Sequence, residues 1–184
     1  MSKITNISPS GRFYGAPSSF GSLRLVGITA DGFKVYDRPT SHCHTDRVVL
    51  VDALLRIHHG TPAFAKHLVE FDHPIAKSTC VPTRAGDQIV FAKRPKRNGW
   101  TRFVLGRTPE PTCIVTIILK RREENPNELI LIASYPGTAE PEPWDRHATE
   151  GSVAFWATHA LCWGSEEVHL DTLAVVDPNM PPAQ

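Results

Sequence analysis

The sequence contains no long hydrophobic run and no secretory signal. No apolar stretch approaches the ~20 residues that a membrane-spanning helix needs. The N-terminus (MSKIT) lacks the apolar core that a secretory signal requires. We therefore expect a cytoplasmic protein that makes no contact with a membrane.

Paired cysteines and nucleotide-binding loops are missing as well. The four cysteines stand at positions 43, 80, 113 and 162, without a CxxC pair. This spacing predicts neither a disulfide framework nor a zinc ribbon, and reduced cysteines usually pack as small hydrophobic residues. GxGxxG and GxxxxGK[ST] motifs are also absent. We therefore expect free thiols and no cofactor.

Length and composition are those of one globular domain. The chain has 184 residues, of which 41% are hydrophobic and 21% charged. That length suffices for one well-buried core and is short for two. Because both ends are rich in Ser, Gly or Pro, we expect a flexible lead-in over residues 1–20 and a flexible tail over 177–184. A single globular domain should occupy residues 21–176.

The basic residues are unevenly distributed, although the net charge is only +1. Six of the 20 Lys and Arg residues fall within fifteen positions that contain no acid. We call this segment, residues 93–107, the basic patch. Its cations are Lys93, Arg94, Lys96, Arg97, Arg102 and Arg107. Positive potential should therefore be concentrated at one place on the surface.

Strand signals dominate the rest of the chain. Residues 113–120 are rich in β-branched side chains, and residues 129–135 should return antiparallel to them. Asp31-Gly32 lies between two short apolar runs, which indicates a hairpin. Residues 88–92 and 160–163 are further strand candidates, whereas residues 47–57 are ambiguous between strand and helix.

Two short helices are predicted. Thr61-Pro62 is typical of a helix start, and Phe64, Leu68 and Phe71 then follow at spacings of four and three. This predicts a helix over 62–71. Ser152 is the expected cap of a second helix, over 152–159. The predicted fold class is α+β, with a mostly antiparallel sheet and one or two short helices packed on one face.

The basic patch has the chemistry of a phosphate-binding surface. Lys and Arg neutralise phosphates, and Arg does so through a rigid two-pronged fork. Trp100, in the middle of the patch, could stack on a base. The alternative is a solvated loop whose charges bind nothing specific. The residues expected to contact a substrate are Lys93, Arg97, Trp100, Thr101 and Arg107.

Histidines are concentrated in the first half of the chain, where six of the nine fall between positions 42 and 73. On an extended segment His42 and His44 share a face, and with Asp46 they could ligate zinc. No HExxH motif or spaced cysteine pair completes such a set, so we predict no metal site. Alternatively, His42 or His44 acts as a general base, because an imidazole pKa of ~6.5 suits proton transfer near neutral pH.

Ser134 and Tyr135 end the second of the two central strands, immediately before Pro136-Gly137. A phenol at an exposed strand end can orient a base or donate to a phosphate oxygen. No GxSxG motif surrounds Ser134, so a hydrolase nucleophile is not predicted.

The two central strands resemble the closing strand pair of small ribonucleases in the barnase–EndoU–colicin–RelE group. The resemblance is strongest to branches associated with phages and polymorphic toxins. There, a strand of the VTVVLK kind precedes one that ends in a Thr-Ala-Tyr-Pro-like motif. Here these stand as VTIILK at 115–120 and ASYP at 133–136. Ala133 replaces the threonine, so Ser134 would have to supply the hydroxyl from the opposite face of the strand.

The resemblance implies a metal-independent, toxin-like endoribonuclease that makes a 2′,3′-cyclic phosphate through 2′-OH attack. The implied partners are RNA and a cognate inhibitor protein. The catalytic residues that it implies are His42, His44, Arg94, Arg102, Ser134 and Tyr135. Two other functions stay open: a non-catalytic RNA- or protein-binding module, and a hydrolase that uses a histidine-ligated metal.

Overall fold

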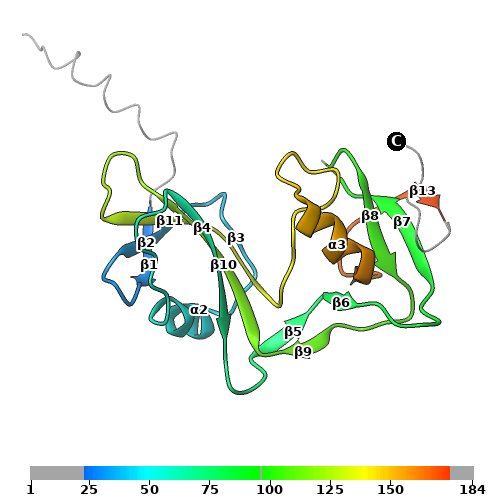
Figure 1. The fold of residues 1–184 in the computed structure, drawn as a ribbon, viewed down its shortest axis with the longest axis horizontal. Helices are drawn as coiled ribbons and strands as arrows, with labels where there is room; N and C mark the ends of the chain where they lie inside the picture. The colour runs from blue at the N-terminus through cyan, green and yellow to red at the C-terminus, as the bar shows by residue number, and fades with distance from the viewer. Residues whose placement is uncertain (1–22, 96, 175–184) are drawn as a thin grey trace, which may run out of the picture.

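The computed structural model describes residues 23–95 and 97–174. Its strands form two larger sheets that lie side by side, connected by a short two-stranded sheet and by the segment 137–149 (Figure 1). Antiparallel pairs predominate and two short helices accompany them, so the predicted α+β class is confirmed for the described residues. The predicted lead-in at 1–20 and tail at 177–184 lie outside this range.

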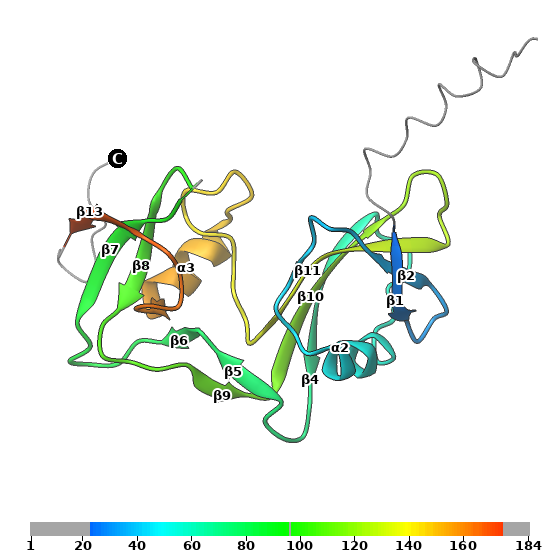
Figure 2. The same ribbon diagram turned by 180° about the vertical axis from the view of Figure 1, so that it is seen from behind.

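The first sheet has six strands and carries one helix. Its order is β1-β2-β11-β10-β4, and β3 pairs with the far half of β11. The helix, α2 (Arg47–Leu54), packs on one face of this sheet (Figure 2). The strands are β1 (Arg24–Ile28), β2 (Lys34–Asp37), β3 (His42–Cys43), β4 (Phe64–Glu70), β10 (Ile114–Arg121) and β11 (Glu128–Pro136).

Local sequence signals located most of this sheet. The β1–β2 hairpin turns at Gly32, whose φ of 89° suits glycine. β10 and β11 pair antiparallel from Val115↔Pro136 to Arg121↔Leu129, with a bulge that leaves Ile132 unpaired with β10. Both the hairpin and the central strand pair were predicted, and both are confirmed.

Helix α2 resolves the ambiguity over residues 47–57. The Asp46 carboxylate caps the helix by accepting a hydrogen bond from the Val48 amide at 2.8 Å. Leu50, Ala53 and Leu54 face the sheet and are buried against it. The apolar residues of this segment therefore form the inner face of a helix. That face is buried because it covers one side of the sheet.

The predicted helix over 62–71 is wrong, since β4 occupies Phe64–Glu70 and pairs with β10 along its whole length. Phe64 and Leu68 share a face in a strand as well as in a helix, because their spacing of four fits both periods. The pairing with β10 decides between the two. It also buries Val69 and Phe71 beneath α2.

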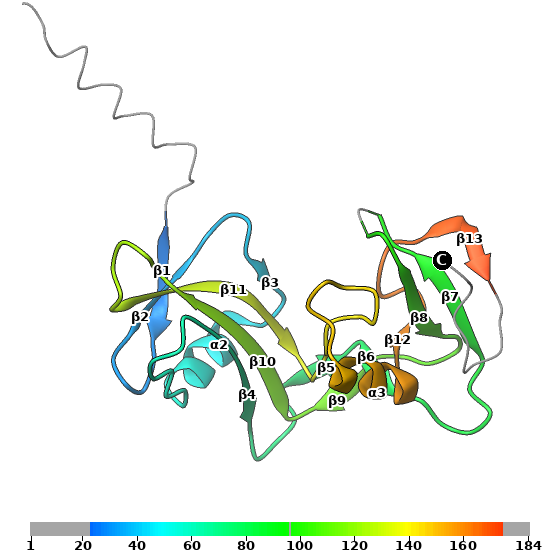
Figure 3. The same cartoon turned by 45° about the horizontal axis from the view of Figure 1, so that its top comes forward.

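The second sheet has the order β13-β7-β8-β12-β6, and helix α3 (Glu150–Thr158) lies against it (Figure 3). The predicted strands at 88–92 and 160–163 are confirmed, within a residue at each end. The remaining strands are β5 (Ala76–Ser78), β6 (Cys80–Pro82), β7 (Ile89–Lys93), β8 (Trp100–Val104), β9 (Glu110–Thr112), β12 (His159–Cys162) and β13 (His169–Ala174). β5 and β9 pair with each other between the two larger sheets.

The cap of α3 differs from the prediction by three residues. Thr149 is the N-cap, and Ser152 is the third residue of the helix. The Thr149 side chain accepts a hydrogen bond from the Ser152 amide, while the Thr149 amide donates to the Ser152 hydroxyl. Both residues thus form a capping box, in which a hydroxyl at the third position reaches back to the cap.

The two larger sheets have separate cores. The first core holds α2 and the inner faces of β4, β10 and β11, and the second sheet is apolar on both faces. That both parts behave as the single predicted domain stays a prediction. Within the described residues, no helix is long and apolar enough to cross a membrane.

Substitution of two adjacent leucines, Leu54 and Leu55, tests whether burial of one face holds α2 on the sheet. Leu54 is fully buried, whereas Leu55 is 57% exposed. Leu54→Ala should lower the free energy of unfolding by ~2–5 kcal/mol. Leu55→Ala should change it by no more than about 0.5 kcal/mol. Urea denaturation measures both, and equal effects would contradict this packing.

Candidate functional site

The basic patch runs from the end of β7 through the hairpin turn and β8 to Arg107. Lys93 ends β7, Arg97 is exposed in the turn, and Trp100 begins β8. The Lys93 ammonium lies 5.2 Å from the centre of the Trp100 ring, within the range of a cation–π interaction. Lys96 lies outside the described residues. The exposed part of the patch is therefore the turn around Arg97.

Arg94 binds the segment that joins the two sheets. Its guanidinium forms an ion pair with Glu142 and donates to the Thr101 hydroxyl at 3.1 Å. Glu142 is only 7% exposed; burial raises the pKa of its carboxyl, and the Arg94 charge opposes that shift. Arg94 thus stabilises a buried carboxylate, and this bond holds the connecting segment against β7 and β8.

Two more patch arginines are bound to protein acceptors. The Arg102 guanidinium is buried and donates to the carbonyl oxygens of Trp156 and Ala157, both at 2.7 Å, at the C-terminal end of α3. That end carries partial negative charge, which a cation stabilises. Arg107 pairs with Asp87 at 2.8 Å and with Glu110. Through these contacts both guanidinium groups stabilise the fold.

The predicted histidines lie on the other sheet, beside the end of β11. His42 pairs with Ala133 in parallel register, and the His44 amide donates to the Ser134 carbonyl at 2.8 Å. Directly paired residues share a face, and residues two apart on a strand do so as well. His42 therefore lies on the same face of the sheet as Ala133 and Tyr135. Both histidines are exposed.

Ser134 lies on the opposite face of β11. Its side chain is fully buried, and its hydroxyl oxygen lies 3.1 Å from the Cys43 sulfur. The alternation along β11 thus separates the two hydroxyl residues that the sequence presents as a pair. Tyr135 is available on the outer face, and Ser134 packs inward.

Tyr135 has a neighbour that the sequence analysis missed. The Lys66 ammonium and the Tyr135 hydroxyl both donate to the carbonyl oxygen of Ala139, at 2.7 and 3.4 Å. Lys66 also pairs with the Glu140 carboxylate at 2.6 Å. Burial raises the pKa of Tyr135 to about 12, so the phenol stays protonated and can donate. An assignment of residues 64–70 to a strand would have placed Lys66 on this face.

A second histidine pair lies at the outer edge of β4. The Nε2 atom of buried His59 is 3.0 Å from the Pro62 carbonyl oxygen, so it must carry the hydrogen. The Nδ1 atom of His59 then accepts from Nε2 of His67, at 3.1 Å. Desolvation lowers the pKa of both rings. Both imidazoles are therefore neutral in the stable form of this pair.

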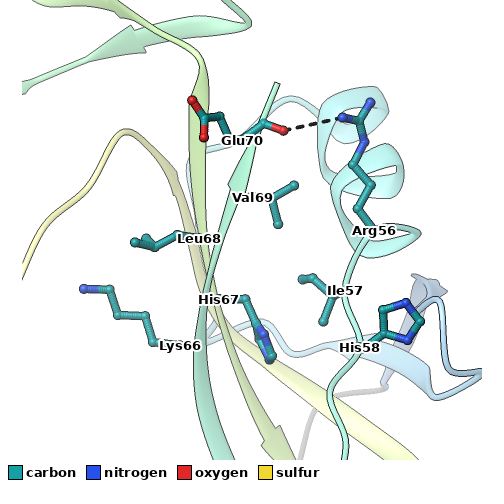
Figure 4. Close-up of a pocket in the computed structure, with 8 residues that line it drawn as sticks. All are labelled: Arg56, Ile57, His58, Lys66, His67, Leu68, Val69 and Glu70. Atoms are coloured by element: carbon teal, nitrogen blue, oxygen red, sulfur yellow. Dashed lines mark hydrogen bonds between the residues drawn. The ribbon is translucent and has the colours of Figure 1, made fainter. Parts of the chain in front are cut away.

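The His67 side chain borders a hollow of ≈ 390 Å³ between β4 and the segment after α2 (Figure 4). Lys66 and Leu68 point to one side of β4, while His67 and Val69 point to the other, toward Ile57. The hollow is lined by residues 56–58 and 66–70. Lys66 lines the hollow and its side chain points to the outer face of the sheet, so the hollow adjoins that face.

The described residues contain no cluster of three or more His, Cys, Asp or Glu side chains placed to hold a metal ion. Asp46, the candidate third ligand beside His42 and His44, uses its carboxylate to cap α2. One Asp46 oxygen is therefore committed to the helix cap and is not placed with the histidines in a metal-binding cluster.

Comparisons with protein-family models, with curated proteins and with solved structures find no match for this chain. The site therefore has to be interpreted from its own geometry. The structure puts His42, Tyr135 and Lys66 on one face of the six-stranded sheet, on β3, β11 and β4, and His44 follows directly after β3. Arg94 and Arg102 are instead bound within the region of the second sheet.

Replacing Arg102 tests whether the patch arginines are structural. Arg102→Leu removes a buried donor from several carbonyl oxygens and should lower the free energy of unfolding by ~3 kcal/mol. The matched change Arg97→Leu, at an exposed site of the same hairpin, should cost no more than about 0.5 kcal/mol. Thermal or urea unfolding gives both values. A smaller loss for Arg102 than for Arg97 would contradict the structural role.

The His59–His67 pair predicts acid sensitivity. Because folding lowers both pKa values, the unfolded chain binds protons more readily, and stability falls as the pH drops through ~6.5 toward the folded values. In His67→Gln this loss should become smaller, because only the contribution of buried His59 remains. His58→Gln, at the exposed neighbouring position, should retain it. Melting temperatures between pH 8 and pH 5.5 test this, and identical slopes in all three proteins would refute it.

Proposed function

We propose that the protein is a metal-independent endoribonuclease whose site is the outer face of the six-stranded sheet. One observation carries the proposal. The β3–β11 pairing places His42 and His44 beside the end of β11, where Tyr135 and Lys66 direct two donors at one oxygen atom. A general base, together with donors that stabilise charge on the phosphoryl oxygens, is what phosphodiester cleavage without a metal uses.

In the proposed reaction, the neutral imidazole of His42 or His44 removes the proton from an RNA 2′-OH. The 2′ oxygen attacks the adjacent phosphorus, and the bond from phosphorus to the 5′ oxygen breaks. The products are a 2′,3′-cyclic phosphate and a 5′-hydroxyl, whose proton comes from water. Lys66 and Tyr135 donate to the phosphoryl oxygens as negative charge builds on them.

In the structure, Lys66 and Tyr135 already donate to acceptors of the same chain. The Ala139 carbonyl and the Glu140 carboxylate occupy the positions that phosphoryl oxygens would take on Lys66. The Lys66–Glu140 pair is partly exposed, and such pairs are worth at most ~1 kcal/mol. A phosphodiester can therefore replace Glu140 on Lys66 at low energetic cost, and to accept from Tyr135 it must also displace the Ala139 carbonyl.

The basic patch has a secondary role in this proposal. Arg97 and the Lys93–Trp100 pair lie on the β7–β8 hairpin and can contact phosphates and a base elsewhere along a longer RNA. Arg94 and Arg102 serve RNA cleavage only indirectly, by holding the segment after β11 and helix α3 in place.

The biological setting follows from the resemblance of strands β10 and β11 to the barnase–EndoU–colicin–RelE group. A toxin-like ribonuclease of this kind acts on cytoplasmic RNA and is held in check by a cognate inhibitor protein. RNA as substrate, the cytoplasm as location and the inhibitor as partner are all parts of the proposal.

Cleavage of end-labelled RNA in excess EDTA tests the reaction. The unmutated protein should produce 2′,3′-cyclic phosphate ends. Loss of the base, in His42→Ala or His44→Ala, should reduce the rate by ~10²–10⁴-fold. Lys66→Met and Tyr135→Phe should reduce the rate through weaker charge stabilisation. The control is His147→Gln, an exposed histidine on the segment before α3.

Circular dichroism must show that each variant is folded. Cleavage that survives the double change of His42 and His44 would refute the assignment of the base. RNA binding without any cleavage by the unmutated protein would refute the enzyme and favour the binding module. Ala133, at the threonine position of the motif, also favours the binding module.

A further inference from the structure

The segment that follows β11 is bound at both of the larger sheets. Residues 138–144, which we call the strap, run from the end of β11 toward α3 (Figure 1). At the six-stranded sheet the strap accepts hydrogen bonds from Lys66 and Tyr135. At the second sheet it is bound by Arg94 and by the indole of Trp156. The strap therefore links the proposed site to groups on the other sheet.

The contacts at the six-stranded sheet occupy the two donors of the proposed site. The Lys66 ammonium lies 2.7 Å from the Ala139 carbonyl oxygen and 2.6 Å from a Glu140 carboxylate oxygen. Tyr135 donates to the same carbonyl at 3.4 Å, which is long for a hydrogen bond from a hydroxyl. A carbonyl and a carboxylate thus lie where phosphoryl oxygens would accept from Lys66 and Tyr135.

These two acceptors differ in how easily they can leave. The Glu140 side chain is 37% exposed, and rotation about its own bonds takes the carboxylate away from Lys66. The Ala139 carbonyl belongs to the main chain, so it leaves Lys66 and Tyr135 only if the backbone of the strap moves. Both donors are therefore free together only after a movement of the strap.

The bonds that oppose this movement lie beside Ala139 on the second sheet and α3. The Trp156 indole donates to the carbonyl oxygens of Glu140 and Pro141, at 2.9 and 3.1 Å. Arg94 pairs with the Glu142 carboxylate. Glu142 is 7% and Trp156 6% exposed, so both bonds are shielded from water. Removing one partner of a buried ion pair is costly, so these bonds fix the strap backbone.

Trp144 fixes the far end of the strap on the basic patch. Its indole donates to the Trp100 carbonyl oxygen at 3.0 Å. The ring also packs on Gly99, where an added Cβ would lie only 2.0 Å from it. The β7–β8 hairpin thus has glycine where the ring needs space.

We infer that the strap is an autoinhibitory segment of the proposed site, held closed from the second sheet by Arg94, Glu142 and Trp156. In the closed state the Ala139 carbonyl occupies Tyr135 and shares Lys66 with Glu140. In the open state both donors bind a phosphodiester. RNA favours the open state because only there does it reach both donors. This regulation rests on the proposed ribonuclease function.

Arg94 and Arg97 lie in the same basic patch but should change RNA binding in opposite directions. Arg94 holds the closed state, and the affinity for RNA is reduced by the fraction of molecules that are closed. Its loss should therefore strengthen binding. Arg97 is exposed and only attracts phosphates, so Arg97→Gln should weaken binding. A patch that simply binds RNA would lose affinity in both cases.

The probe is a short, fluorescently labelled 2′-O-methyl RNA, which lacks the attacking hydroxyl and is not cleaved. Arg94→Gln combined with Glu142→Gln removes the buried ion pair without changing the net charge. Fluorescence anisotropy should show about tenfold tighter binding to this double variant. Adding Lys66→Met should abolish the gain, because the gain comes from a donor at the proposed site.

A matched control removes another ion pair of the six-stranded sheet. Arg122→Gln combined with Glu128→Gln also leaves the net charge unchanged, and neither residue contacts the strap in the described structure. This variant should bind the probe like the unmutated protein. Trp156→Phe removes the other bond beside Ala139 and should strengthen binding as well. It decides the test if circular dichroism shows that the Arg94 and Glu142 variant is unfolded.

Exchange of the Trp156 indole hydrogen with solvent follows the strap without RNA. In the closed state this hydrogen is bonded to two strap carbonyls, so it exchanges only after opening. Nuclear magnetic resonance of protein with nitrogen-labelled tryptophan resolves the indole signals, and Trp156→Phe assigns this one. Exchange should be about tenfold faster in the Arg94 and Glu142 variant than in the unmutated protein and in the control.

Three outcomes would overturn the inference. The first is unchanged or weaker probe binding by the folded variants, and the second is a gain that persists after Lys66→Met. The third is unchanged exchange of the Trp156 indole hydrogen when Arg94 and Glu142 are replaced. Cleavage of unmodified RNA is measured separately. Tighter probe binding without cleavage by any variant would refute the proposed reaction and leave the control of Lys66 by the strap in place.

Discussion

The antiparallel pairing of β10 with β11 is the interaction on which the rest of the structure depends. These strands form the centre of the six-stranded sheet, with β4 on one side and β2 and β3 on the other. Their register determines which face each side chain occupies. Ile117 and Leu119 face α2, and the bulge at Ile132 reverses the alternation of β11, so Leu131 faces the first core while Tyr135 lies on the outer face. A shift by one residue would reverse every side chain.

The segment after β11 connects the six-stranded sheet to the second sheet. Between residues 139 and 144 it is bound by groups from both sheets. Lys66 and Tyr135 donate to Ala139, and Arg94 pairs with Glu142. The Trp156 indole donates to the Glu140 carbonyl at 2.9 Å. A buried ion pair is costly to break by removing one partner, which makes Arg94 the strongest of these attachments. The basic patch is therefore in part a structural clamp.

Arg94 and Arg102 show why charge clusters are hard to interpret from sequence. A run of cations without nearby acids in the sequence looks unpaired, yet Glu142 lies 48 residues beyond Arg94, and Arg102 binds carbonyl oxygens 54 and 55 residues away. Backbone acceptors have no sequence signature. Conversely, no local pattern singled out Lys66 or His67, because their surroundings arise only when β4 pairs with β10.

Long β-branched runs and the Asp-Gly turn determined the central strand pair, the β1–β2 hairpin and the α+β class. These signals suffice because they act within a few residues along the chain. Residues 62–71 were misassigned as a helix because the spacing of Phe64 and Leu68 satisfies both periods. Only the hydrogen bonds offered by β10 favour the strand.

The amino-acid sequence by itself also determined that His42 and His44 could share a face and that Ser134 and Tyr135 could not. Strand alternation settles both. Only the tertiary structure decided which cation joins Tyr135, which arginines are buried and which groups bind the segment after β11. Each of these depends on contacts between segments far apart in the chain, and their energies come from burial and pairing that no local pattern contains.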